Sequence, residues 1–258
     1  MVDIAVYCEG HTEWFVVYKL QKIGVLSSAY LLGSKEYEER KYIDKTWIKN
    51  SIKDLFKEPG ILINPSYTNI LLIYDQEKKP KANDIPQEIT KKAQKKGLSL
   101  TFETDNFSNV FYAKVNGSNI SLFVSDKPGP DGNRDFDGYI VELLECAGPE
   151  IIANLLSDKD IMTISSLRKK VQHLPAKEET VYLLGREDIP GLMSQRDWGV
   201  QRSKTLLYSI ITAAQINKSH VLFSGDVVEK APAEKLKQVF APLIAAWDAL
   251  VAMAAMDA

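Results

Sequence analysis

The chain has 258 residues, and its 34 acidic and 32 basic side chains give a formal net charge of −2. This length suits one large domain or two small ones. Hydrophobic residues make up 45% of the sequence and charged residues 26%, which excludes a largely disordered chain. The near-neutral balance also excludes a protein that coats nucleic acid through bulk positive charge, so any contact with a polyanion requires a local basic patch.

Neither a signal peptide nor a membrane span is expected. The first residues are apolar, but Asp3 and Glu9 bracket a short run that no basic region precedes. No stretch reaches about 18 uninterrupted apolar residues, the length that a membrane helix needs. The two cysteines, Cys8 and Cys146, have neither metal-site spacing nor a histidine cluster nearby, so we expect free thiols in a cytoplasmic protein.

Strands and helices alternate in the first half of the sequence. Residues 3–8 are apolar and partly β-branched, which predicts a buried strand. A sharp turn follows, and helical spacing of apolar residues predicts helices over residues 13–23 and 44–56. The near-continuous apolar run over residues 69–74 is typical of an interior strand that is covered on both faces of its sheet.

A basic segment follows that second strand. Between Lys78 and Lys96 there are seven lysines and two acids, a local charge of +5, and a helix is predicted over residues 86–96. A solvated helix face is one interpretation of this run. A groove for the phosphate backbone is the other, with an affinity that falls as salt rises. The lysines predicted to contact nucleic acid are Lys78, Lys79, Lys81, Lys91 and Lys92.

A hairpin and then helices are predicted for the rest of the chain. The dipeptide Asn116-Gly117 is a hairpin turn signal, and the turn-rich loop 125–134 separates the hairpin from the helices. A short strand is also predicted over residues 181–184. The strands predicted for the hairpin region are 98–104, 107–115 and 120–124, and the predicted helices are 139–146, 149–157, 163–173, 200–216 and 233–256.

This order of elements predicts an α/β protein with a mostly parallel sheet, helices on both faces of that sheet, and a helical C-terminal part. We expect a core domain over residues 1–148 with a β-hairpin insertion near residues 98–124. Residues 149–258 are expected to form a mostly helical part that packs on this core. The sequence shows no internal repeat and no low-complexity linker.

Carboxylates follow the predicted strands. The first strand ends at Glu9, the second ends at Asp75, and the hairpin's return strand is followed by Asp135 and Asp137. Because ligands in open α/β sheets bind beyond the carboxyl ends of the strands, these acids are expected to converge at one edge. Carboxylates suit hard cations such as Mg²⁺, which phosphoryl-transfer sites use. Acids at strand ends are also common because loops are polar, so solvated loop acids are the alternative.

Several segments resemble motifs of the TOPRIM superfamily, which topoisomerases, primases and OLD-family nucleases share. Glu9-Gly10-His11-Thr12-Glu13, between a strand and a helix, resembles the first motif. Asp75-Gln76-Glu77 is similar to the second motif, an Asp-x-Asp at a strand end, with Glu77 in place of the second aspartate. Tyr139 to Leu144, preceded by Asp135-Phe136-Asp137, is similar to an acidic segment of small stand-alone TOPRIM proteins. Arg202-Ser203-Lys204-Thr205 looks like the late lysine that many of these proteins place near the phosphate.

The resemblance implies a metal-dependent nuclease that hydrolyses phosphodiester bonds of DNA or RNA. Glu9 would act as general acid or base and as a metal ligand, and Asp75 and Glu77 would hold Mg²⁺ or Mn²⁺. A carboxylate from Asp135 or Asp137 would complete the metal shell. The late lysine would be catalytic, stabilising charge on the phosphate in the transition state. The resemblance also implies an ATPase partner subunit and a role in prokaryotic defence or repair.

A non-enzymatic function is the alternative. Glu77 departs from the aspartate of the motif, and a degraded metal site would leave a TOPRIM-like module that binds nucleic acid or assembles with a partner. Two neighbours of the first acid also have two interpretations. His11 is either an exposed turn residue or a phosphate or metal contact, and Glu13 is either an acid favourable to the helix dipole or a metal ligand.

Overall fold

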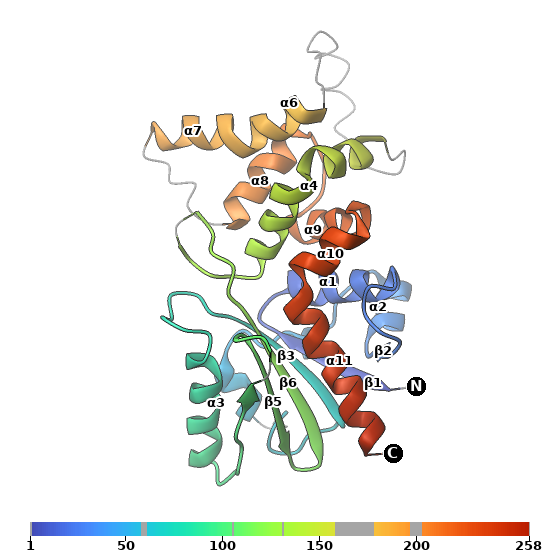
Figure 1. The fold of residues 1–258 in the computed structure, drawn as a ribbon, viewed down its shortest axis with the longest axis vertical. Coiled ribbons are helices and arrows are strands. Elements are labelled where there is room, and N and C mark those ends of the chain that lie inside the picture. The colour runs from blue at the N-terminus through green and yellow to red at the C-terminus, as the bar shows by residue number, and fades with distance from the viewer. Residues whose placement is uncertain are drawn as a thin grey trace. The chain divides into compact units, whose positions relative to one another are not determined.

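The structure is a computed structural model of the chain, which divides into two compact units (Figure 1). The first unit comprises Met1–Asp126 and Phe240–Ala258, and the second comprises Lys127–Val239. The division therefore falls at residue 126 rather than after residue 148, and the C-terminal helix belongs to the first unit instead of the helical part. The residues that the structure describes are 2–57, 61–104, 106–130, 132–157, 178–196 and 203–257.

The first unit is built on a sheet of six described strands in the order β2-β1-β3-β6-β5-β4. The strands β2, β1, β3 and β6 run parallel to one another, and β5 is antiparallel to both of its neighbours, β6 and β4. The prediction of an α/β fold with a mostly parallel sheet is thereby confirmed. The strands are β1 (Asp3–Cys8), β2 (Tyr30–Leu31), β3 (Asn69–Asp75), β4 (Glu103–Thr104), β5 (Val110–Val115) and β6 (Ser118–Ser125).

Apolar side chains bury the central strands on both faces. In β1 only Asp3 is exposed, in β3 every residue before Asp75 is buried, and β6 is buried throughout. Continuous apolar runs of this kind suit parallel strands whose two faces are both covered. The polar residue that follows each run therefore marks where the chain leaves the core.

The predicted hairpin is present, but its return strand lies at the centre of the sheet. Asn116 and Gly117 both have positive φ, 49° and 79°, as a two-residue turn of type I′ requires. Beyond this turn β6 pairs with β3 in parallel, from Asn69↔Asn119 to Asp75↔Ser125. Only β4 and β5 therefore extend the sheet beyond its parallel strands.

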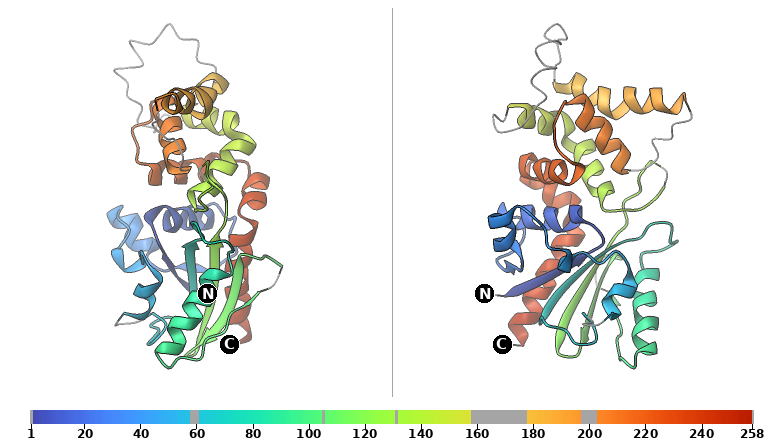
Figure 2. Two further views of the ribbon diagram at one scale, coloured as in Figure 1. Left: turned by 90° about the vertical axis from the view of Figure 1, so that its left-hand side faces the viewer. Right: turned by 180° about the vertical axis from the view of Figure 1, so that it is seen from behind.

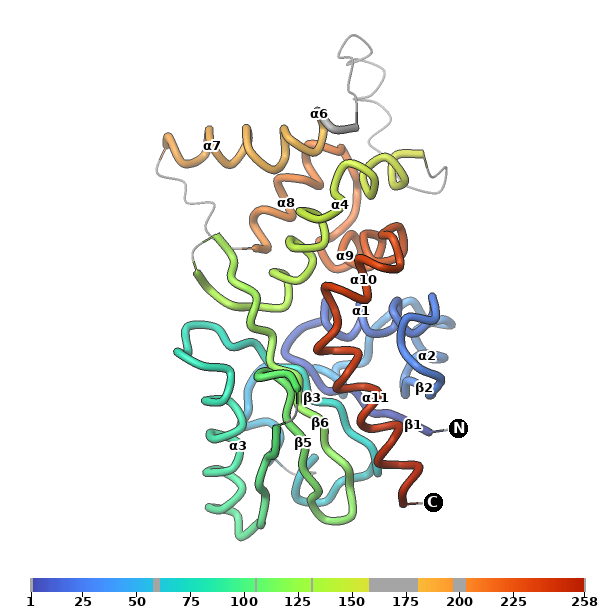
Figure 3. The backbone as a smooth tube through the Cα atoms, in the orientation of Figure 1, coloured from blue at the N-terminus to red at the C-terminus, as the bar shows by residue number. Residues whose placement is uncertain are grey.

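Helices cover both faces of this sheet. The helix α11 (Ala241–Met256) lies against one face, and α3 (Asp84–Lys95) lies on the opposite face (Figure 2). Trp247 anchors α11, because its indole is fully buried and its N–H donates to the carbonyl of Ser27 at 3.1 Å. The tube trace shows α11 returning toward the N-terminal strand β1, so both ends of the chain lie in the first unit (Figure 3). The remaining helices of this unit are α1 (His11–Lys22) and α2 (Ser34–Arg40).

The prediction of one helix over residues 44–56 is wrong. Two short 3-10 helices replace it, η1 (Lys45–Trp47) and η2 (Ile52–Phe56). Each has its own N-cap: Asp44 accepts from the N–H of Thr46 at 2.7 Å, and Ser51 forms a capping box with Asp54. Because a cap satisfies the first amides of a helix, a second cap within the segment starts a new helix there.

The second unit is helical in its described residues. The strand predicted over residues 181–184 is wrong, because this segment continues a helix. The predicted helices 139–146 and 149–157 form one element that is broken at Ala147. The predicted helix 163–173 and the start of the one over 200–216 lie outside the described residues. The elements are α4 (Asp137–Ser157), α6 (Glu178–Leu183), the π-helical η3 (Leu184–Asp188), α7 (Ile189–Ser194), α8 (Ser203–Ala213), α9 (His220–Lys230) and α10 (Ala233–Val239).

The helix predicted over residues 233–256 is two helices, α10 and α11, which meet at Phe240. In the described part of the chain, no single helix is long and apolar enough to cross a membrane. Among the described helices, this bent pair alone reaches such a length and composition, and only when its two helices are taken together.

Candidate functional site

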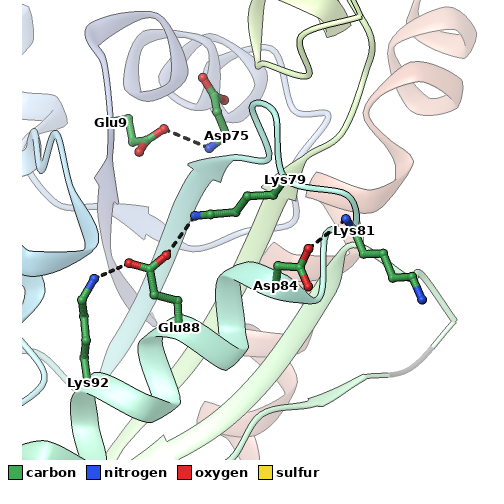
Figure 4. A network of polar contacts seen from close by, with 7 residues as sticks. All are labelled: Glu9, Asp75, Lys79, Lys81, Asp84, Glu88 and Lys92. Atoms are coloured by element: carbon green, nitrogen blue, oxygen red, sulfur yellow. Dashed lines mark hydrogen bonds and ion pairs between the residues drawn. The ribbon is translucent and has the colours of Figure 1, made fainter.

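Two acids lie side by side at the carboxyl edge of the sheet. The parallel pairing of β1 and β3 runs from Ala5↔Ile70 to Cys8↔Ile73, which brings Glu9 next to the end of β3. The backbone N–H of Asp75 donates a hydrogen bond to Oε2 of Glu9 at 3.0 Å (Figure 4). The register thus places the two strand-end acids together, as expected for neighbouring parallel strands.

The environment of Glu9 favours its protonated form. Burial raises the pKa of its carboxyl to about 7, and the negative charge of Glu77 acts in the same direction. The hydrogen bond from the Asp75 amide and the positive charge of Lys79 lower the pKa of Glu9 but do not offset its burial. A carboxyl with a pKa near 7 can accept or release a proton at neutral pH.

Glu77 lies on a turn rather than on the strand. The sheet ladder ends at Gln76, whose N–H donates to the carbonyl of Ser125 at 2.9 Å. Glu77 then has a left-handed φ of 52°, and the N–H of Lys79 closes the turn on the Gln76 carbonyl at 3.1 Å. Its exposed side chain influences the pKa of Glu9 without being part of the buried strand end.

A third acid, Glu13, is buried beside the same turn. Glu13 belongs to the first turn of α1 and is 5% exposed. A Cβ on Gly10 would lie 2.9 Å from its Oε2, so glycine is what lets this carboxylate lie against the turn. The pKa of the buried Cys8 thiol is raised by burial first, and then by the charges of Glu13, Asp75 and Glu9. Three carboxylates therefore act on one buried thiol.

The lysines after β3 begin a chain of charges beside Glu9. Nζ of Lys79 pairs with Glu88 at 3.0 Å, and Lys92 pairs with the other oxygen of the same carboxylate (Figure 4). The backbone N–H of Lys81 donates to Asp84, the first residue of α3, at 3.0 Å. Glu88 therefore forms ion pairs with two of the lysines that were predicted to contact nucleic acid, Lys79 and Lys92.

The other lysines predicted to contact nucleic acid face solvent. Lys78 and Lys91 are exposed and, in the described part of the chain, have no carboxylate partner. The opposite side of α3 is apolar, with Ile85, Ile89 and Ala93 buried. This helix therefore anchors a basic surface on the unit that carries Glu9.

The second unit brings together its own predicted site residues. Asp137 begins α4, and its pKa is raised to about 7 by burial and by the charge of Asp135, whereas Lys204 acts to lower it. Oδ1 of Asp135 accepts the N–H of Gly138 at 2.9 Å. Oδ1 of Asp137 is buried and has no hydrogen-bond partner among the described residues. Asp135, Asp137 and Lys204 thus form a second group, within the second unit.

The chain matches no family model, no curated protein and no solved structure. The TOPRIM assignment therefore stays a prediction from the motif residues. The placement of two of those motifs is what the structure adds: Glu9 and Asp75 end adjacent parallel strands and touch.

The donor set at this edge suits a cation that the substrate helps to hold. Among the described residues, no three His, Cys, Asp or Glu side chains are arranged to hold a metal ion. Glu9 and Asp75 supply hard carboxylate oxygens, and Mg²⁺ is commonly bound by one or two carboxylates together with waters and substrate phosphates. The residues present therefore fit Mg²⁺ or Mn²⁺ bound jointly with a phosphate, and they do not fit an all-protein cage.

Proposed function

We propose that the chain is a TOPRIM-type nuclease that hydrolyses phosphodiester bonds of DNA or RNA with Mg²⁺ or Mn²⁺. The observation that supports the proposal is the contact between Glu9 and the amide of Asp75, at the edge where open α/β sheets bind ligands. The raised pKa of Glu9 is of the kind that functional acids and bases show.

Glu9 would move the proton in this reaction. With a pKa of about 7, its carboxyl is present in both forms at neutral pH, so it can take a proton from an attacking water or give one to the leaving oxygen. The hydrogen bond from the Asp75 amide holds one carboxylate oxygen in place and leaves the other to act. A fixed orientation of the acting group removes part of the entropic cost of reaching the transition state.

Glu9 and Asp75 would hold the divalent cation together with the substrate phosphate, and the part of Glu77 as a further ligand stays a prediction of the resemblance. When bound, the cation supplies charge neutralisation at the phosphate oxygens and a more acidic water. The exposed lysines of the segment 78–96 would bind the nucleic-acid backbone next to this edge. The role of Lys204, with Asp135 and Asp137, stays a prediction of the resemblance.

Cleavage assays on purified protein test this function. Wild-type protein should cleave labelled DNA or RNA in the presence of Mg²⁺ or Mn²⁺ and stop when the cation is chelated. Glu9→Gln and Asp75→Asn should lose activity by at least about a hundredfold, the lower range of acid–base contributions. Glu103→Gln, an exposed acid on β4, is the matched control and should retain activity. Undiminished cleavage in both site variants would remove the proposal.

A nucleic-acid-binding module without catalysis is the second candidate. The lack of a three-residue metal group among the described residues and the exposed position of Glu77 favour it. This function predicts salt-sensitive binding of nucleic acid and no heat of Mn²⁺ binding in calorimetry. A Mn²⁺ site that Asp75→Asn abolishes would count against it.

An ATPase partner and a role in prokaryotic defence or repair also belong to the proposed function, through the same resemblance. The partnership is tested by adding an ATPase that co-purifies with the chain and measuring whether the nuclease activity then depends on ATP. An activity that never responds to ATP or to that subunit would confine the function to the chain alone.

A further inference from the structure

A polar cavity of about 530 Å³ opens in the first unit between β1 and residues of the segments 46–57 and 61–67. Tyr7 and Tyr67 contribute aromatic rings to its lining, and η2 contributes Asp54. Its volume falls within the roughly 300–1,000 Å³ of ordinary small-molecule sites. None of its lining residues belongs to the predicted metal or lysine sets.

The cavity lies on the same face of the sheet as Tyr74, the residue before Asp75. Tyr7 pairs with Leu72 of β3, and residues two apart in a strand face the same side, so Tyr7 and Tyr74 share that face. The hydroxyl of Tyr74 donates to the carbonyl of Ser51 at 3.4 Å, next to η2. Tyr74 directly precedes Asp75, so the residue that contacts the N-cap of η2 also adjoins the acid whose amide contacts Glu9.

Among the described lining residues, one lysine, Lys49, forms no ion pair, although its charge acts on Asp44. Lys57 pairs with Asp54 at 2.5 Å, so these two charges offset each other. Lys49 has no carboxylate within ion-pair distance among the described residues, and its Nζ lies 5.8 Å from the centre of the Tyr7 ring. The neutral donors and acceptors of the lining are Thr46, Asn50, Asn64 and Ser66. Such a lining suits an anion that also carries polar groups.

The backbone holds Lys49 beside the proposed reaction centre. Its N–H donates to the carbonyl of Cys8 at 2.7 Å, and Ile48 forms an isolated parallel bridge with Cys8. Cys8 directly precedes Glu9, so Lys49 is fixed to the end of the strand that presents Glu9. The backbone of Lys49 is thus fixed before a ligand arrives, which lowers the entropic cost of bringing its side chain to the ligand.

We propose that this cavity binds one unpaired nucleotide of the nucleic-acid substrate, with its phosphate on Lys49 and its base or sugar against the amide and hydroxyl groups. The inference rests on the proposed nuclease function and names its substrate class: a strand with a single-stranded segment or end. A cavity of this size takes one nucleotide, whereas the bases of an intact duplex are paired and stacked within the helix. Unpaired bases can instead be splayed out against protein side chains.

Binding measured without cleavage tests the cavity. The probes are short fluorescein-labelled single strands of DNA and of RNA, titrated with protein in the presence of a chelator and followed by anisotropy. Lys49→Gln should weaken binding about tenfold, the value of one charge-assisted contact. Lys53→Gln removes the same charge from an exposed position of η2 that does not line the cavity, and it should bind like wild type.

A second variant and a set of competitors sharpen the test. Asn64→Asp adds a negative charge to the lining at nearly constant volume, so it should weaken binding at least as much as Lys49→Gln, and thermal melting shows whether each variant folds. A nucleoside monophosphate should displace the probe better than the nucleoside or inorganic phosphate does. Equal binding by folded Lys49→Gln, Asn64→Asp and Lys53→Gln would overturn the proposal. Equal competition by a blunt duplex and a single strand would overturn it as well.

The outcomes separate this proposal from the nuclease proposal. Glu9→Gln should keep single-strand binding while losing cleavage. If the wild type binds through Lys49 yet never cleaves with Mg²⁺ or Mn²⁺, the nuclease proposal fails while the cavity still binds nucleotides. If cleavage occurs and both cavity variants bind normally, the cavity proposal fails and the nuclease proposal stands.

Discussion

Replacing Glu9 by glutamine removes a charge that the folded protein holds at a cost. Folding raises the pKa of Glu9 from 4.5 to about 7, so the folded state binds this proton more tightly than the unfolded chain does. The stabilising contribution of the protonated side chain is therefore fully present below about pH 4.5 and is lost as the pH rises through about 7. Glutamine stays neutral at every pH, so the variant keeps the stability that wild type loses.

The size of the effect follows from the pKa. One pKa unit corresponds to about 1.4 kcal/mol, so the whole shift is on the order of 3 kcal/mol. Glu9 is only half-buried, and solvent screening reduces this to about 1–2 kcal/mol. The amide oxygen of glutamine can still accept the N–H of Asp75. We therefore expect Glu9→Gln to be more stable than wild type by about 1–2 kcal/mol at pH 8 and equal to it at pH 4.

Urea unfolding at a series of pH values, with a chelator present, measures this difference. The free energies of unfolding of wild type and Glu9→Gln should diverge between pH 4 and pH 8. Glu103→Gln, an exposed acid on β4, should run parallel to wild type over the whole range. A Glu9→Gln variant that is less stable than wild type at pH 8 would refute the reasoning, because it would show that the ionised carboxylate stabilises the fold. A gain at pH 8 together with a loss of cleavage is the pattern expected of a functional residue that is held at the expense of stability.

Other substitutions and one reagent test the surroundings of this site. Glu88→Gln should release Lys79 and Lys92, which raises the affinity for single-stranded nucleic acid and adds about one to two phosphate contacts to the slope of log affinity against log salt. Anisotropy at several salt concentrations measures this slope, and an unchanged slope would contradict the prediction. Gly10→Ala should displace the Glu13 carboxylate, because the new Cβ would lie 2.9 Å from its Oε2, and should destabilise the protein by no more than about 1 kcal/mol in urea unfolding. Cys8 should resist a thiol reagent in the native state, because its thiol is fully buried and its pKa is raised. The exposed Cys146 should react at once. Mass spectrometry identifies the modified residue, and early labelling of Cys8 would contradict its buried position.

The strands that carry the candidate site were predictable because their signal is local. The apolar runs before Glu9 and Asp75 bury nearly every residue, and such runs are characteristic of interior parallel strands. Once both runs are strands of one parallel sheet, their carboxyl ends meet at one edge. The contact between the two acids also requires that β1 and β3 be neighbours, a long-range pairing that the structure supplies.

The segment 44–56 shows where a periodic pattern misleads. Its apolar residues have helical spacing, but Asp44 and Ser51 each cap a separate short helix. The sequence also hides the burial of Glu13. An acid such as Glu13 in the first turn of a helix usually lies exposed and interacts with the free amides there. The sequence signal for its burial is Gly10, which has no side chain and so leaves room for the carboxylate at the turn.

The division of the chain depends on contacts between residues far apart in sequence. The last helix packs on β3, β5 and β6 of the first unit, although more than a hundred residues separate it from them. No local pattern encodes that return: α11 is apolar on most of its surface, which is compatible with any buried position. The boundary at residue 126 therefore could not be read from composition or spacing.

The protonation of Glu9 distinguishes the two candidate functions. A cation bound beside the carboxyl favours its ionised form and lowers its pKa, whereas a bound phosphate without a cation adds negative charge and raises it. A nuclease therefore predicts that Mg²⁺ or Mn²⁺ moves the titration of Glu9 below its present value of about 7. A binding module predicts that the cation leaves the titration in place and that nucleic acid moves it upward.

The pH dependence of wild-type stability relative to Glu9→Gln reports this titration directly, because the variant lacks only the titrating group. Repeating that comparison with cation alone and with single-stranded nucleic acid alone gives opposite shifts for the two functions. A titration that neither ligand moves would show that no charged ligand binds within reach of Glu9. That result would remove the electrostatic basis of both functions at once, since each requires charge to gather at this edge of the sheet.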